Sequence, residues 1–424
     1  MTDPGRAPSL LALVLVLTLV PVPASAEDAP PTVELWTIGT GEDLYARFGH
    51  TAIRVARPGW TDRVYNYGTT DFSRPDLVTS FMTGEAEFWL GVSTGDRSER
   101  IYRKVDRSIV VDELLLPPGA AHELARALHA EADDREASTY QYHHFLDNCA
   151  TRARDRIDVA SGGALRAVAD RWQAGPTFRD LARAGFADMP WLLVGVDLLL
   201  GRPADRQADP WEEMFLPATL QRAVLEAEVV WPDGATRPLA GAQRVLYERE
   251  GPPVADADPG LPVRMTWLVA AALALLALAR GLAGGRPRRI EGLLLLVAGL
   301  LGGLVAVAVD VVAWMSIQHE VRANETLLWA WPLDLWLVVP GVALLLRRRG
   351  MLRWVKWYAV VRGGALALAL AAQLPGWLIQ PQLHLMVAWL AGWGLVWATL
   401  MHDSASPRST GLASPAEEPG RRTP

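Results

Sequence analysis

The pattern of apolar and polar residues divides the chain into two parts of different character. Up to about residue 264, short segments alternate apolar with polar side chains or repeat them at helical spacing. Beyond Pro262, long apolar runs occupy about 265–283, 291–313, 326–346, 355–374 and 383–401. Each run approaches the roughly 20 residues that a helix needs to cross a bilayer. The pattern therefore predicts a water-soluble part followed by an all-α domain of five transmembrane helices.

The water-soluble part begins with the alternation that is typical of β-strands. Such segments occupy 32–37, 50–55, 64–68 and 109–116. Helical spacing occupies about 75–84, 119–133, 149–161, 178–185 and 216–228. Strands and helices that do not strictly alternate favour an α+β fold over a doubly wound one. The sequence contains no internal repeat, P-loop or dinucleotide fingerprint.

The first 26 residues have the features of a secretory signal peptide. Arg6 precedes an apolar run over 10–20, and Ala24-Ser25-Ala26 resembles a cleavage site. The run is too short to span a membrane comfortably, which favours cleavage over an uncleaved anchor. We therefore expect an exported protein.

Charge supports this division and predicts an orientation. Residues 27–264 hold 26 Lys and Arg against 38 Asp and Glu, whereas residues 265–424 hold 14 against 8. The acidic soluble part argues against nucleic acid as a partner, because phosphate binding favours a basic surface. Cations gather around 280–289 and 347–356, in the first and third loops between the apolar runs. Positive loops mark the cytoplasmic side, so we expect the soluble part outside the cytoplasm and the C-terminus inside.

Cys149 is the only cysteine, so it cannot form an intramolecular disulfide. A lone cysteine is most often a small buried apolar residue, but this one follows Asp147 and Asn148, which are suited to cap a helix. A thiol at a helix N-terminus lies near the positive end of the helix dipole, which favours the nucleophilic thiolate. The N–H groups there can stabilise an oxyanion, and Asn148 and Arg152 are candidates to support it.

A thiol nucleophile usually needs a base, and His50 is our candidate among the eight histidines. It begins a predicted strand, and a strand is a rigid support for an imidazole ring. Asn66 lies in the next predicted strand, between Tyr65 and Tyr67. An amide there can orient the ring as in Cys-His-Asn sites, although Asn66 alone fits equally well as a turn former.

We expect no metal and no cofactor. The nearest set of ligand types is His143, His144 and Asp147. Adjacent histidine side chains usually diverge, and the helical i, i+4 spacing of zinc ligands is missing.

Three segments together resemble the extracytoplasmic domain of the Lnb family of bacterial lipoprotein acyltransferases. They are FGHTAIRV (48–55), YNYGTTDF (65–72) and DNCATRARD (147–155). DLLLGRPADR (197–206) and EEMFLPATL (212–220) are similar to its later blocks. In the membrane part His319, Asn324 and LLWAWPL (327–333) resemble its outer-loop pattern, whereas QHEVRANET (318–326) departs from it.

The resemblance implies a circularly permuted papain-like fold, similar to lecithin:retinol acyltransferase and NlpC-type hydrolases. It implies that Cys149 is the nucleophile and His50 the base, with Asn66 as the third residue and Asn148, Tyr67 and Arg152 as supporting candidates. The family moves an acyl chain from a diacylglyceryl lipoprotein onto the lipoprotein's own α-amine. The resemblance thus implies a lipid or lipoprotein substrate and a place in the bacterial inner membrane.

The expected domains follow from these patterns. They are a signal peptide at 1–26, a permuted papain-like thiol domain at 27–165, a helical and membrane-proximal segment at 166–264, a five-helix transmembrane domain at 265–402, and a disordered cytoplasmic tail at 403–424. An acyltransferase that works through a Cys149 thioester accounts best for the membrane part. A thiol hydrolase or peptidase acting on cell-wall peptide or lipid ester stays open, as does a non-enzymatic envelope assembly factor.

Overall fold

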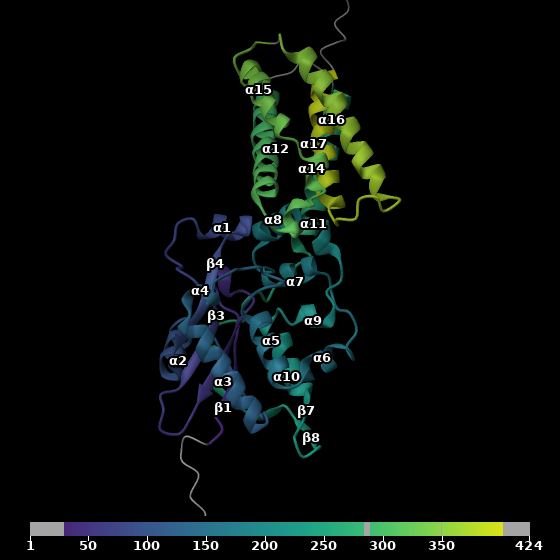
Figure 1. The fold of residues 1–424 in the computed structure, drawn as a ribbon. Helices are drawn as coiled ribbons and strands as arrows, with labels where there is room; N and C mark the ends of the chain where they lie inside the picture. Colours follow the sequence, from purple (N-terminus) through teal and green to yellow (C-terminus); the bar gives the residue numbers. More distant parts are fainter. Residues whose placement is uncertain (1–28, 284–288, 349, 402–424) are drawn as a thin grey trace, which may run out of the picture.

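A computed structural model describes residues 29–283, 289–348 and 350–401. The predicted signal peptide and C-terminal tail lie outside these residues. Figure 1 shows two parts stacked end to end, a sheet-containing N-terminal part and a helical C-terminal part. The fold is therefore mixed α+β followed by all-α, as the hydrophobic pattern predicts.

A seven-stranded antiparallel sheet forms the centre of the N-terminal part, in the order β6-β4-β3-β2-β1-β5-β9. Its strands are β1 (Thr32–Ile38), β2 (His50–Ala56), β3 (Arg63–Thr69), β4 (Glu87–Ser93), β5 (Ile109–Leu114), β6 (Tyr140–Gln141) and β9 (Ala240–Tyr247). A separate pair joins β7 (Glu228–Val230) to β8 (Thr236–Pro238). Because β9 completes one edge, the sheet reaches beyond the range 27–165 that we expected for the thiol domain.

Helices and short helical turns surround the sheet. They are η1 (Leu44–Ala46), α1 (Leu77–Thr83), α2 (Gly95–Lys104), α3 (Pro118–Asp133), α4 (Arg135–Ser138), α5 (Cys149–Ala160), α6 (Ala164–Ala169), α7 (Phe178–Gly185), α8 (Pro190–Leu199), η2 (Arg202–Asp205), α9 (Pro210–Glu213) and α10 (Pro217–Glu226). Helices α3 and α5 contact one face of the sheet, while α2 contacts β3.

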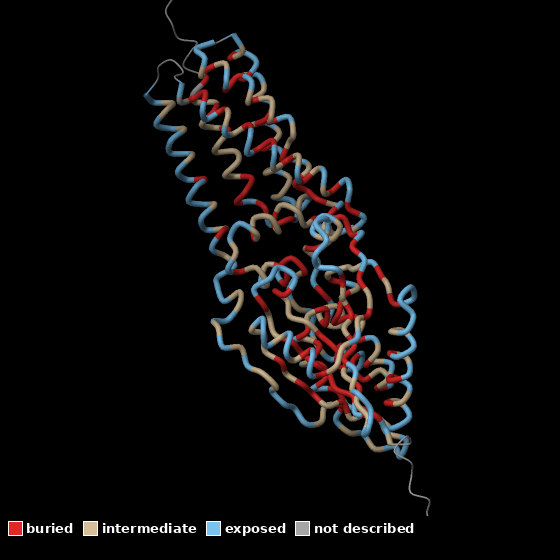
Figure 2. Tube along the Cα trace, turned by 90° about the vertical axis from the view of Figure 1, so that its left-hand side faces the viewer, coloured by how far each residue is buried: buried red, intermediate tan, exposed pale blue. Residues whose placement is uncertain are grey.

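The alternation of apolar residues along the strands gives the sheet two buried faces. Leu35 and Ile53 pack with Ile157 of α5 in the larger core. Trp36 and Val64 pack in a smaller cluster on the opposite face. Each is next in sequence to a residue of the larger core, Leu35 or Tyr65. Successive side chains of a strand point to opposite faces, so the same strands supply both cores. Figure 2 shows the buried segments gathered inside this part.

The C-terminal part is a bundle of apolar helices. Its elements are α11 (Leu261–Ala283), α12 (Arg289–Met315), α13 (His319–Arg322), α14 (Thr326–Trp329), η3 (Pro332–Leu337), α15 (Val338–Leu345), α16 (Leu352–Gln373) and α17 (Leu383–Met401). Large side chains such as Leu268, Leu275 and Leu282 of α11 are exposed on its outside. An exposed apolar surface of this kind suits a lipid environment.

By length and composition, three helices among the described residues are suited to cross a membrane: α11, α12 and α16. A fourth span is formed if the bent pair His319–Trp329 and Pro332–Leu345, with an angle of 45°, counts as one. The apolar stretch Leu383–Ala398 of α17 is shorter. The structure thus supports three or four spans, and the fifth stays a prediction.

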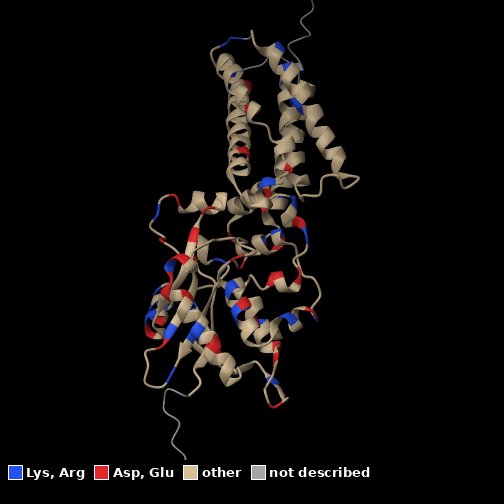
Figure 3. Cartoon of the chain, in the orientation of Figure 1, with Lys and Arg blue, Asp and Glu red and all other residues tan. Residues whose placement is uncertain are grey.

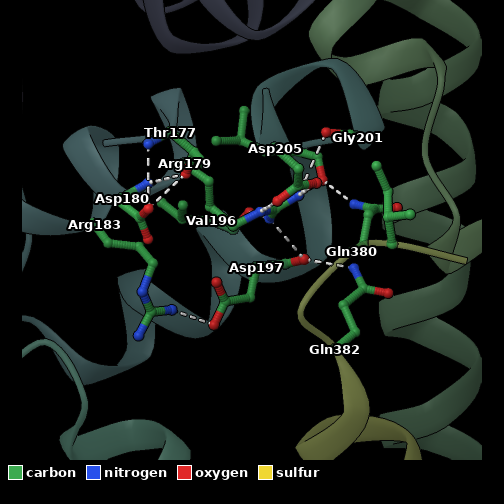
Figure 4. A network of polar contacts seen from close by, with 12 residues as sticks. Thr177, Arg179, Asp180, Arg183, Val196, Asp197, Gly201, Asp205, Gln380 and Gln382 are labelled. Carbon is green, nitrogen blue, oxygen red and sulfur yellow. Dashed lines mark hydrogen bonds and ion pairs between the residues drawn. The ribbon is translucent and has the colours of Figure 1, made fainter. Parts of the chain in front are cut away.

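The two parts are joined where α8 ends, as Figure 4 shows. The last carbonyl groups of a helix lack partners within the helix, and here the membrane part supplies them. Gln382 Nε2 donates to the carbonyl of Asp197 at 2.6 Å, and Asn324 Nδ2 donates to that of Leu198 at 2.7 Å. These contacts fix the N-terminal part against the outer loops of the bundle.

Arg179 of α7 completes this junction from the side of the soluble part. Its guanidinium is buried, pairs with Asp205 at 2.7 Å and donates to the carbonyl of Leu200 at 2.8 Å. Gln380 of the membrane part donates to the same carbonyl at 2.5 Å. Burying an arginine is costly unless its donors are satisfied, so this arrangement is specific to the docked position.

Candidate active site

Cys149 is the first residue of α5, and Asn148 is its N-cap. Asn148 Oδ1 accepts from the N–H groups of Ala150 and Thr151, both at 2.9 Å. Thr151 Oγ1 in return accepts from the N–H of Asn148 at 2.7 Å, which completes a capping box. The Asn148 amide also donates to the carbonyl of Phe215 at 3.0 Å. These bonds hold the nucleophile candidate in one place, which makes Asn148 a structural support of the thiol.

The Cys149 side chain is 6% exposed. Burial raises the pKa of the thiol, while the N–H groups of Thr51, Ala150 and Cys149 and the charge of Arg107 oppose that rise. From its position at a helix N-terminus we expected a stabilised thiolate. Burial and the helix end therefore act in opposite directions on the thiol, and the raised pKa favours its protonated form at rest.

His50 is the first residue of β2, and its ring is fixed by Asn66 of β3. The His50 Nε2 atom lies 3.2 Å from Asn66 Oδ1. Asn66 Nδ2 donates to the carbonyl of Val64 at 3.1 Å, which orients the amide with Oδ1 towards the ring. We assign the tautomer from these partners: Nε2 carries the hydrogen and Nδ1 is the free base. Burial and the charge of Arg107 lower the pKa of His50 to about 4.

Strands β2 and β3 bring this pair close to the helix that bears Cys149. A Cβ atom placed on Gly68, two residues after Asn66, would lie 3.6 Å from Cys149 Cβ. The register of β3 shifts between Asn66 and Thr69, and Gly68 has a φ of +85°. Bulges of this kind often re-aim residues beside active sites. The structure contains no hydrogen bond between Cys149 and His50, both of which are described. Their connection runs through Thr51, which follows His50 in β2 and whose N–H acts on the Cys149 sulfur.

Two residues that the sequence did not indicate complete the surroundings of His50. The Tyr102 ring of α2 lies 6.1 Å from the His50 ring, and its hydroxyl donates to Asn66 Oδ1 at 3.4 Å. The Arg107 guanidinium lies 5.5 Å from the Tyr102 ring. Asn66 therefore accepts from two side chains, His50 and Tyr102.

The remaining site candidates are engaged with acidic groups or lie elsewhere. The Tyr67 hydroxyl donates to Glu131 at 2.6 Å, and Arg152 forms a two-pronged pair with Asp147 at 2.6 and 2.8 Å. His319 is exposed at the start of α13. Asn324 is buried at the junction with α8, where it binds backbone carbonyl groups. None of these contacts tests a catalytic role.

An aromatic cluster lies next to the Cys149 N-cap. It consists of Phe48, Phe81, His144, Phe145, Phe178, Phe186 and Phe215. The His144 carbonyl accepts from Asn148 Nδ2 at 2.8 Å, so this cluster directly contacts the N-cap of α5. Burial lowers the pKa of His144 to about 4, with a smaller effect of His143. Phe178 comes from α7 and Phe81 from α1, which place the cluster beside elements that contact the membrane part.

Within the described residues, no three His, Cys, Asp or Glu side chains are grouped to hold a metal ion. His143 instead lies 3.1 Å from Glu320, and the His144 ring packs among phenylalanines.

Residues 26–184 match the family model of the Lnb N-terminal periplasmic domain. The match runs from ahead of β1 into α7 and includes His50, Asn66 and Cys149. No curated protein and no solved structure matches the chain. With three or four helices suited to cross a membrane, the chain is a membrane protein, and its extracytoplasmic N-terminal part belongs to the Lnb N-terminal periplasmic domain family.

Proposed function

We propose that this protein is an extracytoplasmic thiol acyltransferase anchored in the membrane. It moves an acyl chain from a diacylglyceryl lipoprotein, or from another membrane lipid, to an amine through a thioester on Cys149. The observation that carries the proposal is the oriented His50–Asn66 pair, 3.2 Å apart, beside the capped N-terminus of the Cys149 helix. The family match of this part of the chain supports the same chemistry.

The chemistry proceeds from two neutral groups. The pKa of the Cys149 thiol is raised and that of His50 is lowered to about 4, so neither is charged at pH 7. The sulfur attacks the ester carbonyl carbon, and its proton passes to Nδ1 of His50 as in general base catalysis. The C–O bond of the ester breaks, and the same proton moves to the departing glyceryl oxygen.

A neutral amine then attacks the thioester carbonyl. Its proton passes through His50 to the sulfur as the C–S bond breaks, which restores the thiol and the neutral imidazole. The products are an amide and a lyso lipid, and no oxidant or cofactor is consumed. The N–H groups at the start of α5 are suited to stabilise the oxyanion of both tetrahedral adducts.

A permuted papain-like arrangement is part of the proposal. Its support is the chain order, in which the base precedes the nucleophile, together with a helix that carries the thiol and packs on an antiparallel sheet. In thiol enzymes of this type an amide orients the ring nitrogen that faces away from the sulfur. Asn66 contacts Nε2 of His50, and in this proposal Nδ1 is the nitrogen that serves the sulfur.

The membrane part holds the site near its substrate in this proposal. The aromatic cluster beside the Cys149 N-cap is packed and apolar, which in this proposal favours an acyl chain over a polar substrate at this end of the site. Figure 3 shows few charges along the bundle and cations at its end farthest from the sheet, where Arg347, Arg348 and Arg353 lie. Positive loops mark the cytoplasmic side, which supports five spans in a bacterial inner membrane, a periplasmic thiol domain and a cytoplasmic C-terminus.

Mass spectrometry of a diacylglyceryl lipopeptide tests the function. Detergent-purified wild type is compared with Cys149→Ser. An unchanged total mass with one acyl chain moved to the N-terminal amine, seen with wild type alone, is the expected result. Release of that chain as free fatty acid would indicate a hydrolase instead. A lipopeptide unchanged by wild type at all would overturn the lipoprotein substrate and favour a non-enzymatic role.

A further inference from the structure

Among the residues that the structure describes, no carboxylate forms an ion pair with the buried guanidinium of Arg107. Arg107 lies in the segment between α2 and β5 and is 7% exposed. Its Nε atom donates to the carbonyl of Gly39 at 2.8 Å. Its Nη2 atom is buried without a hydrogen-bond partner. A buried donor that lacks a partner is costly, so its retention calls for an explanation.

The other buried arginines show what a structural role looks like in this protein. Within the described ranges, every other arginine with less than a tenth of its surface exposed pairs with a carboxylate. The pairs are Arg47–Asp188, Arg154–Asp155, Arg179–Asp205 and Arg362–Asp334. Arg107 forms no ion pair with a carboxylate in the described part of the chain, so it differs from all of them.

Arg107 lies close to Tyr102 of the thiol site, and its charge also reaches the exposed loop that bears Tyr45 and Asp43. Its charge acts on Tyr102, Cys149, Tyr45 and Asp43, of which Asp43 accepts a hydrogen bond from Tyr45. The charge of Arg107 lowers the pKa values of both His50 and Cys149. It thereby disfavours the charged form of the imidazole but favours the charged form of the thiol. Tyr102 packs between Arg107 and the His50–Asn66 pair.

We propose that the missing counter-ion of Arg107 is formed during the reaction: the guanidinium is the built-in cation for the anion that develops on Cys149 and on the carbonyl oxygen of its adduct. The inference rests on Cys149 being the nucleophile of the proposed function. It explains how a site with a neutral imidazole supplies the positive charge that a thiolate needs. It also assigns Arg107 as a positioning residue that acts through charge.

The test measures thiol ionisation rather than catalysis. Because Cys149 is the only cysteine, alkylation of the full-length, detergent-purified protein by iodoacetamide reports on this thiol alone. The rate is measured from pH 6 to pH 11 for wild type, Arg107→Met and Arg107→Lys, and the ratio of rates below the midpoint reports its shift. Arg154→Met is the matched control, since Arg154 is also buried and lies on α5 itself, but is paired with Asp155.

The other titratable groups around the thiol do not interfere over most of this range. Burial raises the pKa of Tyr102 to about 12 and raises those of Tyr140 and Tyr142 further. His50, with a pKa near 4, stays neutral above pH 6. A shift of the alkylation midpoint between variants therefore reports the charge at position 107.

We expect Arg107→Met to raise the midpoint by about one pH unit and to slow alkylation about tenfold below it. Arg107→Lys should keep the midpoint within about half a unit, and Arg154→Met should leave it unchanged. A wild-type profile in a folded Arg107→Met protein would overturn the proposal, as would failure of both Arg107→Met and Arg107→Gln to fold. If wild type transfers no acyl group but the midpoint still shifts, the proposed function fails and the electrostatic role of Arg107 stands.

Discussion

Glu320 of the membrane part lies 3.1 Å from His143 Nε2, six residues before Cys149. His143 Nδ1 accepts from the N–H groups of Phe145 and Leu146, so Nε2 carries the hydrogen and donates to the carboxylate. Backbone bonds of 3.0 Å in both directions join His143 to Asp147. The loop that leads into the nucleophile is thus closed on itself and fixed to an outer loop of the bundle.

This contact predicts that the membrane part influences the thiol site. Glu320→Ala should lower acyl transfer by about tenfold or more, because misplacement of a catalytic group costs up to about 10²-fold. Glu320→Gln keeps an acceptor oxygen and should retain most activity. Exposed Glu248→Ala is the control. Equal activity of Glu320→Ala and wild type in the lipopeptide assay would show that the membrane part serves only as an anchor.

The three residues of the proposed machinery should differ in the size of their effects. Cys149→Ser and His50→Ala should each lower kcat by about 10³-fold or more, because nucleophile and base act as a unit. Asn66→Ala should cost about 10-fold to 100-fold, since water can partly replace the amide that orients the ring. His122→Ala, on α3, is the control. If Asn66→Ala is as damaging as His50→Ala, the amide has more than an orienting role.

Two buried histidines make the soluble part sensitive to acid. His50 and His144 each have a pKa lowered to about 4, chiefly by burial. The unfolded chain binds their protons near pH 6.5 and the folded chain does not, so their stabilising effect is complete above pH 6.5 and declines as pH falls towards 4. Each group contributes about 3 kcal/mol to that decline.

The apparent unfolding temperature between pH 7.5 and pH 4.5 measures this effect. His144→Phe should lose less stability on acidification than wild type, because the ring stays among its phenylalanine neighbours without a titratable nitrogen. His129→Phe, at an exposed histidine, is the comparison. An acid sensitivity in His144→Phe that equals wild type would contradict the assignment.

The Asn148 cap predicts a link between stability and thiol exposure. Asn148→Ala should cost about 1–2 kcal/mol of stability, since it removes the acceptor for two N–H groups and a donor to two carbonyl groups. With the first turn of α5 loosened, Cys149 should be alkylated faster while acyl transfer declines. Asp134→Ala, which removes the cap of the distant α4, should leave the alkylation rate unchanged. A slower alkylation in Asn148→Ala would refute this relation.

The sequence predicts those strands and helices that are determined by the residues of one short segment. The segments expected at 32–37, 50–55 and 64–68 became β1, β2 and β3, and the helix expected at 149–161 became α5. In contrast, β9 joins β5 from more than a hundred residues away, and none of its residues is fully buried, so it lacks an alternating pattern. The pattern of residues within one short segment does not show which distant segment it pairs with.

The site shows the same limit. His50, Asn66 and Cys149 could be chosen because their side chains carry recognisable chemistry and stand at the ends of predicted elements. Arg107 lies in the charged segment RKVDRS, which is typical of a solvated surface. Its burial depends on how α2 and β5 pack, which no single segment encodes. Tyr67 was expected beside Asn66 as a supporting candidate of the site. Successive side chains of a strand point to opposite faces, so Asn66 points towards His50 while Tyr67 points towards Glu131.

The lone cysteine has a consequence for the lifetime of the protein outside the cytoplasm. An exported thiol meets oxidants, and this chain has no second cysteine to convert a sulfenic acid into a repairable disulfide. Oxidation depends on the thiolate and on access. The enclosure of Cys149 and its raised pKa keep the resting sulfur protonated and covered. The features that postpone ionisation until a substrate arrives therefore also protect the nucleophile from oxidative damage between turnovers.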